Sequence, residues 1–141
     1  MTREEAENEV FRLYQSGFHC AESISKAMIQ IFAEDTKSFT PKIATGFGGG
    51  IGGTHLETCG ALNGGIIALG WLLGRTKPAA DRTEVYELAA QYREKFVEQF
   101  GSSQCQTLLN GFGKQENMMK CKKLTAEAAG ILYDLITAGK K

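Results

Sequence analysis

Residues 46–74 read GFGGGIGGTHLETCGALNGGIIALGWLLG, a glycine-rich loop that leads into a single cysteine and then into a long apolar segment. From Thr58 to Gly74 the chain runs for 17 residues without a charge. Small residues recur there every four positions, in the sets Gly60, Gly64 and Ala68, Ala61 and Gly65, and Gly70 and Gly74. Glycine costs a helix interior about 1 kcal/mol relative to alanine, so this many glycines indicate close packing between backbones. We predict a central buried helix that presents Cys59 at its N-terminus and has the other helices packed around it.

The bulk composition is that of one ordinary globular domain. The 141 residues suffice for a hydrophobic core, and 43% of them are hydrophobic. Lys plus Arg and Asp plus Glu both number 16, so the formal net charge is zero. This balance argues against nucleic acid or an anionic membrane surface as a partner. We expect a single four-cysteine helical domain over residues 1–141, with a homodimer as one option for its assembly.

We expect neither export nor membrane insertion. Residues 1–7 are acidic and polar, without the apolar core that a secretory signal needs. The uncharged segment 58–74 is at the lower limit of membrane-spanning length, and its glycines and Asn63 favour a buried helix over a span. We therefore predict a cytoplasmic protein. In a reducing cytosol the four cysteines are expected to be thiols, metal ligands or redox partners and not structural disulfides.

Apolar residues recur with helical spacing along the rest of the chain, and no segment shows sustained two-residue alternation. This pattern predicts an all-α, single-domain bundle of about five to seven helices around the central Gly-rich helix. Glu34–Ser38 reads as a polar loop, and Asn110-Gly-Phe-Gly reads as a turn. The predicted helices are Arg3–Ser16, Ala21–Ala33, a short helix from Pro41 to Thr45 capped by Thr40, the central helix from Cys59 to Gly74, Ala79–Phe100, a short helix that carries Cys105 and is capped by Ser102 or Ser103, and Lys120–Ala138.

The four cysteines are far apart in the sequence but share one local position. Each lies within the first turn of a predicted helix, and they are Cys20, Cys59, Cys105 and Cys121. A helix N-terminus carries about half a positive charge and free N–H donors, which favour a thiolate over a thiol and lower the cysteine pKa. If the four helix starts converge, they form a site suited to concentrated negative charge. Such a site holds either four thiolates around a metal or cluster, or a reactive pair of thiols.

The cysteine spacing alone is compatible with three kinds of protein. The first binds a metal or an iron–sulfur cluster; close pairs such as C-x-x-C are absent, but a helical bundle can gather distant ligands. The second is a metal-free thiol–disulfide oxidoreductase or thiol sensor. The third is a non-catalytic helical interaction module with four buried apolar cysteines, because free cysteine is among the most buried residue types. The missing C-x-x-C weakens thioredoxin-like chemistry more than it weakens a cluster, so we rank the metal site slightly first.

Three further stretches accompany the cysteines: GFGGGIG at residues 46–52, CGALNG at 59–64 and FGSSQC at 100–105. With them the chain resembles a family of redox-active bacterial proteins of about this length, the C_GCAxxG_C_C family, although here glycine follows the motif cysteine. The resemblance covers nearly the whole chain. It implies a redox role, with iron–sulfur electron transfer suggested by fusion of similar domains to haem-carrying modules. Neighbouring transporter genes suggest an accessory role in a transporter-associated system, with an unidentified redox partner.

The resemblance places all four cysteines in the site, as metal ligands or, without metal, as redox-active thiols. In the second case the helix-dipole argument makes Cys59 the attacking thiol, with Cys20 or Cys121 as its resolving partner. The glycine loop lacks the Lys-Ser/Thr pair of a phosphate-binding P-loop, which argues against nucleotide binding. We expect its N–H groups to point at sulfur or at a cluster as an anion-binding nest. The glycines assigned to this role are Gly48, Gly49, Gly50 and Gly60.

Four polar residues near the cysteines have alternative interpretations. His19 and His55 are candidates for a metal ligand, a haem ligand or a base for the neighbouring thiol, although a loop histidine is more often a surface residue. Glu22 and Glu57 are candidates for proton relays, but carboxylates in a first helical turn are ordinary partners of the helix dipole. Whether the protein is an enzyme stays open at this point.

Overall fold

The computed structural model describes residues 1–33 and 41–139, in which the chain is helical apart from loops and one isolated β-bridge. The prediction of an all-α bundle is confirmed for these residues. The expected loop at 34–38 and the expected cap Thr40 lie outside them. The elements are α1 (Arg3–Gln15), α2 (Cys20–Phe32), the 3-10 helix η1 (Pro41–Phe47), α3 (Gly60–Leu73), α4 (Thr83–Phe100), α5 (Cys105–Phe112) and α6 (Met119–Gly139).

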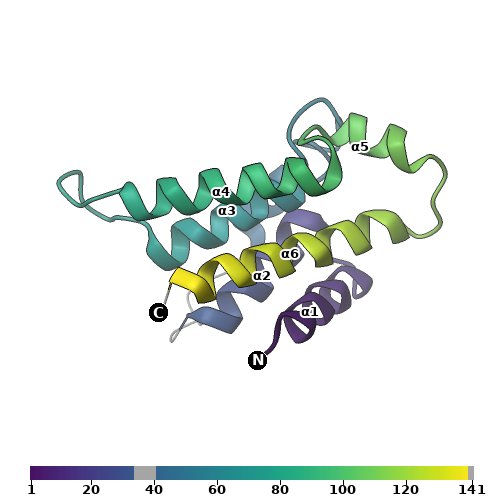
Figure 1. Cartoon of the computed structure of the whole chain (residues 1–141). Coiled ribbons are helices and arrows are strands. Elements are labelled where there is room, and N and C mark those ends of the chain that lie inside the picture. The colour runs from purple at the N-terminus through teal and green to yellow at the C-terminus, as the bar shows by residue number, and fades with distance from the viewer. Residues whose placement is uncertain (34–40, 140–141) are drawn as a thin grey trace.

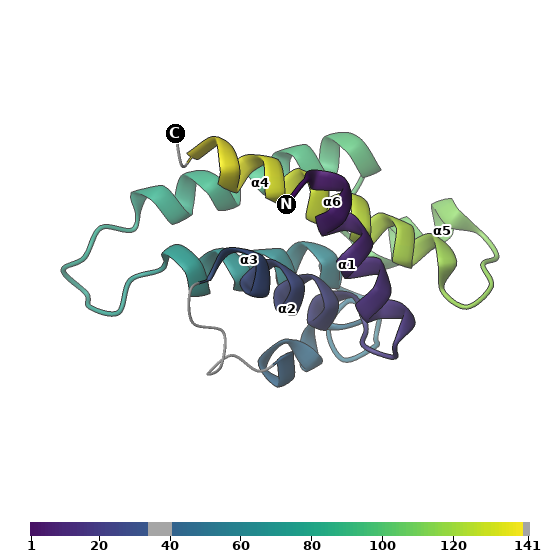
Figure 2. The same ribbon diagram turned by 90° about the horizontal axis from the view of Figure 1, so that it is seen from below.

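Helices α2, α3 and α6 run in the same direction, so their N-termini lie together at the end of the molecule where α1 ends and α5 lies (Figures 1 and 2). The Gly-rich helix α3 contacts α2, α4, α6 and η1, in agreement with its predicted central place. Buried residues of α1, α2, α3, α4 and α6 join in one hydrophobic cluster. The fold thus gathers several positive helix ends around one point while the core fills the opposite side.

The small residues of α3 are contact points with its neighbours. A Cβ atom on Gly64 would lie 2.5 Å from the Ala21 carbonyl oxygen and 2.7 Å from its Cα atom, both on the backbone of α2. A Cβ atom on Gly65 would lie 2.5 Å from the ring of Tyr92 in α4. Glycine is therefore required at both positions, because any side chain would push these helices apart.

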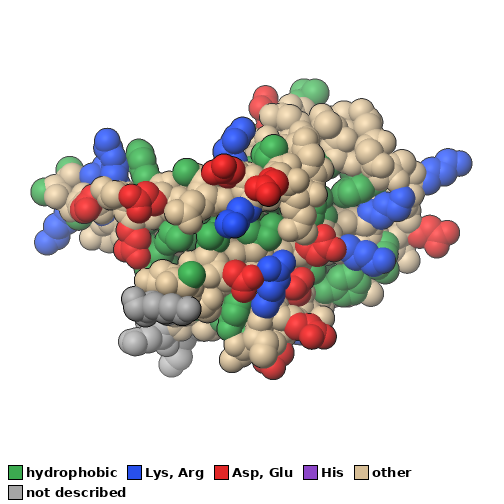
Figure 3. Space-filling view, in the orientation of Figure 1, with side chains coloured by type: hydrophobic (Ala, Val, Ile, Leu, Met, Phe, Trp, Pro, Cys, Tyr) green, Lys and Arg blue, Asp and Glu red, His purple; other side chains and the backbone are tan. Residues whose placement is uncertain are grey.

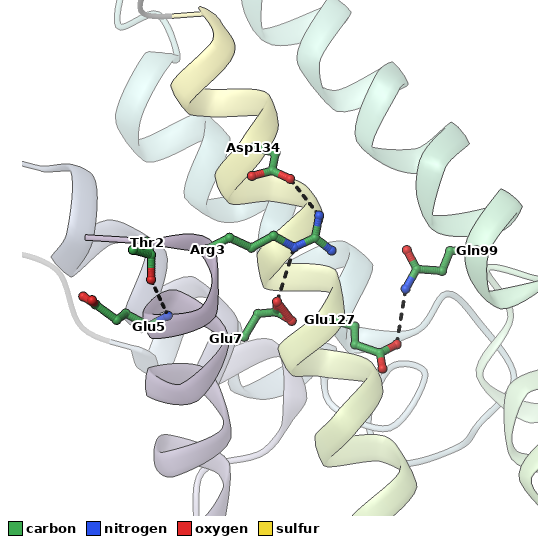
Figure 4. A network of polar contacts seen from close by, with 7 residues as sticks. All are labelled: Thr2, Arg3, Glu5, Glu7, Gln99, Glu127 and Asp134. Atoms are coloured by element: carbon green, nitrogen blue, oxygen red, sulfur yellow. Dashed lines mark hydrogen bonds and ion pairs between the residues drawn. The ribbon is translucent and has the colours of Figure 1, made fainter.

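Polar contacts fasten the outer helices to α6 (Figure 4). Arg3 donates to Glu7 of its own helix at 3.3 Å and to Asp134 of α6 at 2.7 Å. Gln99 near the end of α4 donates to Glu127 of α6 at 3.2 Å. The start of α1 is fixed separately, because the Thr2 hydroxyl accepts from the Glu5 N–H at 3.1 Å and caps the helix.

Two predicted boundaries are wrong. Helix α4 begins at Thr83, not at Ala79, because the Asp81 carboxylate accepts from the backbone N–H and the hydroxyl of Thr83 and so holds a turn in place of a helix. Helix α5 continues through Asn110 and Gly111 to Phe112, where a turn was expected. Leu108 and Phe112 face a common cavity, so tertiary packing outweighs the weak helix propensity of the residues between them.

The surface carries both signs of charge. In Figure 3 acidic and basic side chains are interspersed over the visible face. The salt bridges of the described residues join α1 to itself or to α6, and none involves a residue that lines the cavity of the four cysteines. Within the described ranges, no helix is both long enough and apolar enough to cross a bilayer.

Candidate functional site

All four cysteines line one cavity of about 50 Å³ at the end of the bundle where the helices begin. Cys20 is the first residue of α2, Cys59 caps α3, Cys105 is the first residue of α5, and Cys121 lies in the first turn of α6. The predicted convergence of the helix starts is therefore present. Apolar side chains complete the walls: Leu108, Leu109, Phe112, Met118 and Leu124.

A short antiparallel pairing brings Cys59 and Cys105 to the same wall. The N–H of Cys59 donates to the Ser103 carbonyl at 2.7 Å, and the N–H of Cys105 donates to the Glu57 carbonyl at 3.0 Å. The bridge between Thr58 and Gln104 lies in the middle of this pairing. Two cysteines 46 positions apart are thereby fixed side by side by backbone hydrogen bonds, which no local sequence pattern reveals.

The loop before α3 has an unusual backbone, since residues 49–53 all have φ between +60° and +70°. Glycine adopts this region freely, whereas Ile51 and His55 are there at φ +69° and +63°. Strained residues of this kind persist when the surrounding structure determines them, and they concentrate at functional sites. The curl of the loop places Gly49 and His55 on the cavity wall.

The four glycines assigned to the site have different roles. The N–H groups of Gly49 and Gly60 donate toward the Cys20 sulfur, as the predicted nest requires. Gly50 is buried against Cys105, since a Cβ atom on it would lie 2.6 Å from the Cys105 Cβ. The N–H of Gly48 donates to the Thr45 carbonyl instead of a sulfur, so Gly48 takes no part in the nest.

The predicted lowering of the cysteine pKa values is wrong for these thiols. Burial raises the pKa of Cys59 to about 12 and that of Cys105 to about 11, and it also raises the pKa of Cys20 and Cys121. The helix N-termini and the N–H groups of the nest lower the cysteine pKa values, but the cost of burying a negative charge is the larger effect. The neighbouring sulfurs add to the effect, because a thiolate at Cys20 disfavours ionisation of the other three.

Gln115 is a site residue that the sequence interpretation missed. Its side-chain oxygen accepts from the N–H groups of Lys120 and Cys121, at 2.9 and 3.1 Å, and so caps α6. Its side-chain nitrogen donates to the Cys121 sulfur at 3.2 Å, which lowers the pKa of that thiol against the larger effect of burial. No motif marks this residue, because it acts through a loop that folds back on the helix start.

The other polar candidates are divided between the cavity and the surface. His19 and His55 both line the cavity, so each lies near the sulfurs. Glu22 accepts from the His19 N–H at 3.1 Å and from the Thr45 hydroxyl at 2.9 Å, which agrees with its ordinary interpretation as a partner of the helix end. Glu57 is exposed, and only its backbone takes part in the site.

The sulfurs surround the cavity without closing on one point. Across the ranges that the structure describes, no three His, Cys, Asp or Glu side chains come close enough together to hold a metal ion. All four cysteines are free thiols. The donor set, four thiols with N–H groups directed at one of them, is nonetheless the chemistry that thiolate-bound centres use.

Comparison with known proteins agrees with this site. Residues 18–135 match the family model described as "Putative redox-active protein (C_GCAxxG_C_C)", a segment that includes all four cysteines and the loop before α3. No curated protein and no solved structure matches the chain significantly. Because the match extends over far more than half of the sequence and contains every sulfur of the cavity, the chain belongs to the C_GCAxxG_C_C family of redox-active proteins.

Proposed function

We propose that the four cysteines bind an iron–sulfur cluster and that the protein transfers electrons. The observation that carries this proposal is the single cavity lined by Cys20, Cys59, Cys105 and Cys121. When bound, such a cluster supplies one-electron oxidation and reduction, the electron arriving from a reduced partner and leaving to an oxidised one. The chain itself provides the thiol ligands, the N–H donors and the apolar walls that limit access of water.

The arrangement of the sulfurs favours a cluster over a single ion. One structural zinc ion requires four cysteine or histidine ligands about 2.0–2.3 Å from a common point, and the described residues contain no group of three or more such side chains that could hold an ion. A cluster has several irons, so its ligands are distributed around a larger centre and suit sulfurs that surround a cavity. The N–H groups of Gly49 and Gly60 directed at Cys20 resemble the hydrogen bonds to sulfur that tune such centres.

The raised pKa values weigh against thiol–disulfide chemistry. An attacking thiol needs a substantial thiolate fraction near neutral pH, and burial holds the pKa of Cys59 at about 12. Bound iron would remove this obstacle, because a cation in the cavity would stabilise the thiolates that burial disfavours. The same residues are therefore poor free nucleophiles and suitable ligands.

We place the protein in the cytosol, where cysteines remain reduced, with a redox partner of a transporter-associated system.

The test is the metal content of the full chain purified without oxygen. We expect iron and acid-labile sulfide in comparable amounts, together with visible absorption that disappears in each single Cys→Ser variant. Tyr86→Phe is the control, because Tyr86 is 62% exposed and remote from the cavity. Protein that contains neither iron nor zinc, or zinc alone, would contradict the proposal. A reversible disulfide in such protein would instead indicate the metal-free alternative, in which two thiols give two electrons and two protons to an acceptor disulfide.

A further inference from the structure

Tyr14 lines the four-cysteine cavity, although the helical pattern of α1 assigns it only to the core. It is 5% exposed and lies in the last turn of α1, before the segment that matches the family model. Tyr14 is therefore outside the shared motif, and its place in the site comes from the fold alone.

The hydroxyl of Tyr14 has no hydrogen-bond partner among the described residues. Tyr92, which is fully buried, differs in this respect, since its hydroxyl donates to the Ala61 carbonyl at 2.8 Å. The Tyr14 hydroxyl is reached by solvent, and because the residue lines the cavity, the hydroxyl is available to donate to a ligand bound there.

The ring of Tyr14 is held in place from two sides. The Lys122 ammonium lies 5.7 Å from the ring centroid, and the His19 ring lies 5.9 Å from it in a tilted arrangement. Lys122 is itself fixed by donating to Gln15 at 2.6 Å. The ring is thus positioned by His19, which caps α2, and by Lys122 of α6, and it borders both the four-cysteine cavity and a second pocket.

The electrostatics agree with this placement. Burial raises the pKa of Tyr14 far above its ordinary value, and negative charge on each of the four cysteines, Cys20 first, raises it further. The phenol therefore stays protonated and is a donor only. It lies within electrostatic reach of every sulfur of the site, which suits a donor to the centre that the sulfurs surround.

We propose that Tyr14 donates a hydrogen bond to a sulfur atom of the bound cluster and thereby raises the reduction potential of the centre. This inference rests on the function proposed above. A hydrogen bond to sulfur stabilises the more negative, reduced state, so its loss lowers the potential. No other tyrosine of the described chain lines this cavity, so the effect is specific to Tyr14.

The test compares reduction potentials of full-length protein purified without oxygen. Tyr14→Phe removes the hydroxyl and keeps the ring, so we expect unchanged iron content and a more negative midpoint potential in a titration followed by absorbance. Tyr133→Phe is the control, because it removes a hydroxyl that donates to the Met1 carbonyl outside the cavity, so the potential should stay at the wild-type value. An iron-loaded Tyr14→Phe protein with the wild-type potential overturns the proposal.

A second substitution covers the case in which Tyr14→Phe loses the cluster. Replacement of Tyr14 by 3-fluorotyrosine keeps the hydroxyl and makes it a stronger donor, so the potential should move in the positive direction. No movement overturns the role of Tyr14 while leaving the cluster itself established. Wild-type protein without iron has a different consequence, because it overturns the proposed function and this inference together.

Discussion

The N-terminal end of α3 and its C-terminal end contain the same small residues in different surroundings. Gly60 and Gly64 are buried, and a Cβ atom on either would clash with α2 or with the site. Gly70 is exposed, with no atom within 4 Å of the position of its missing Cβ, and Trp71 beside it is 42% exposed. The regular glycine spacing thus reflects close packing at the cysteine end only. Close packing of this helix is confined to the end that carries the cysteine. We therefore expect glycine-to-alanine substitutions at its two ends to change the free energy of unfolding in opposite directions.

Gly64→Ala should produce the largest effect. The added methyl group would meet backbone atoms of Ala21, which cannot rotate away, so α2 and α3 must separate. We expect a loss of roughly 2–3 kcal/mol in the free energy of unfolding, measured by urea denaturation. A change below about 0.5 kcal/mol would show that the two helices are less closely packed than described.

Gly60→Ala should have a smaller effect on stability and a specific effect on the site. Its Cβ would meet the Cys20 sulfur and lie 2.9 Å from the Phe47 carbonyl oxygen. Because the sulfur can turn aside, we expect a loss of about 1–2 kcal/mol, but also a displaced ligand and a clear fall in iron per chain. Iron content equal to that of wild type would mean that the position of the Cys20 sulfur does not matter for binding.

The sequence predicts the features that neighbouring residues determine and misses those that contacts between distant residues determine. Apolar stripes locate the helices, and the position of each cysteine at a helix start is local information, so both could be read in advance. The pairing beside Cys59 and Cys105, the Gln115 contact and the unpartnered Tyr14 hydroxyl arise from residues far apart in the chain. The direction of the cysteine pKa values also depends on burial, which the helix-dipole argument omits.

The metal-free protein should lose stability above about pH 8.5, where a cysteine of the unfolded chain ionises. Burial holds the pKa of Cys59 at about 12, so between these values the unfolded chain has released the proton while the folded protein retains it. The unfolded state then binds fewer protons, and stability falls with pH by up to about 1.4 kcal/mol per unit for this thiol. The contribution of the Cys59 thiol to stability is fully present below about pH 8.5, the pKa of a cysteine in the unfolded chain.

Cys59→Ser isolates this contribution, because serine does not ionise in the range. Urea denaturation of metal-free protein from pH 8 to 10.5 should give a shallower pH dependence for Cys59→Ser than for wild type. Identical slopes would show that the thiol is ionised as readily in the fold as in the unfolded chain.

Gly70→Ala should have the smallest effect and the opposite sign. The added methyl group meets no atom, so the substitution only improves helix propensity and stabilises the fold by up to about 1 kcal/mol. Iron content should not change, which makes this variant the control for Gly60→Ala. A destabilised Gly70→Ala protein would reveal a contact at the exposed end of α3, for example with a second copy of the chain.

The most direct test of the central claim is the X-ray absorption spectrum of iron in protein purified without oxygen. The account predicts a first shell of sulfur alone and a second shell of iron, as expected when Cys20, Cys59, Cys105 and Cys121 hold one cluster. Iron with nitrogen or oxygen ligands and no iron neighbour would contradict it, as would protein without iron.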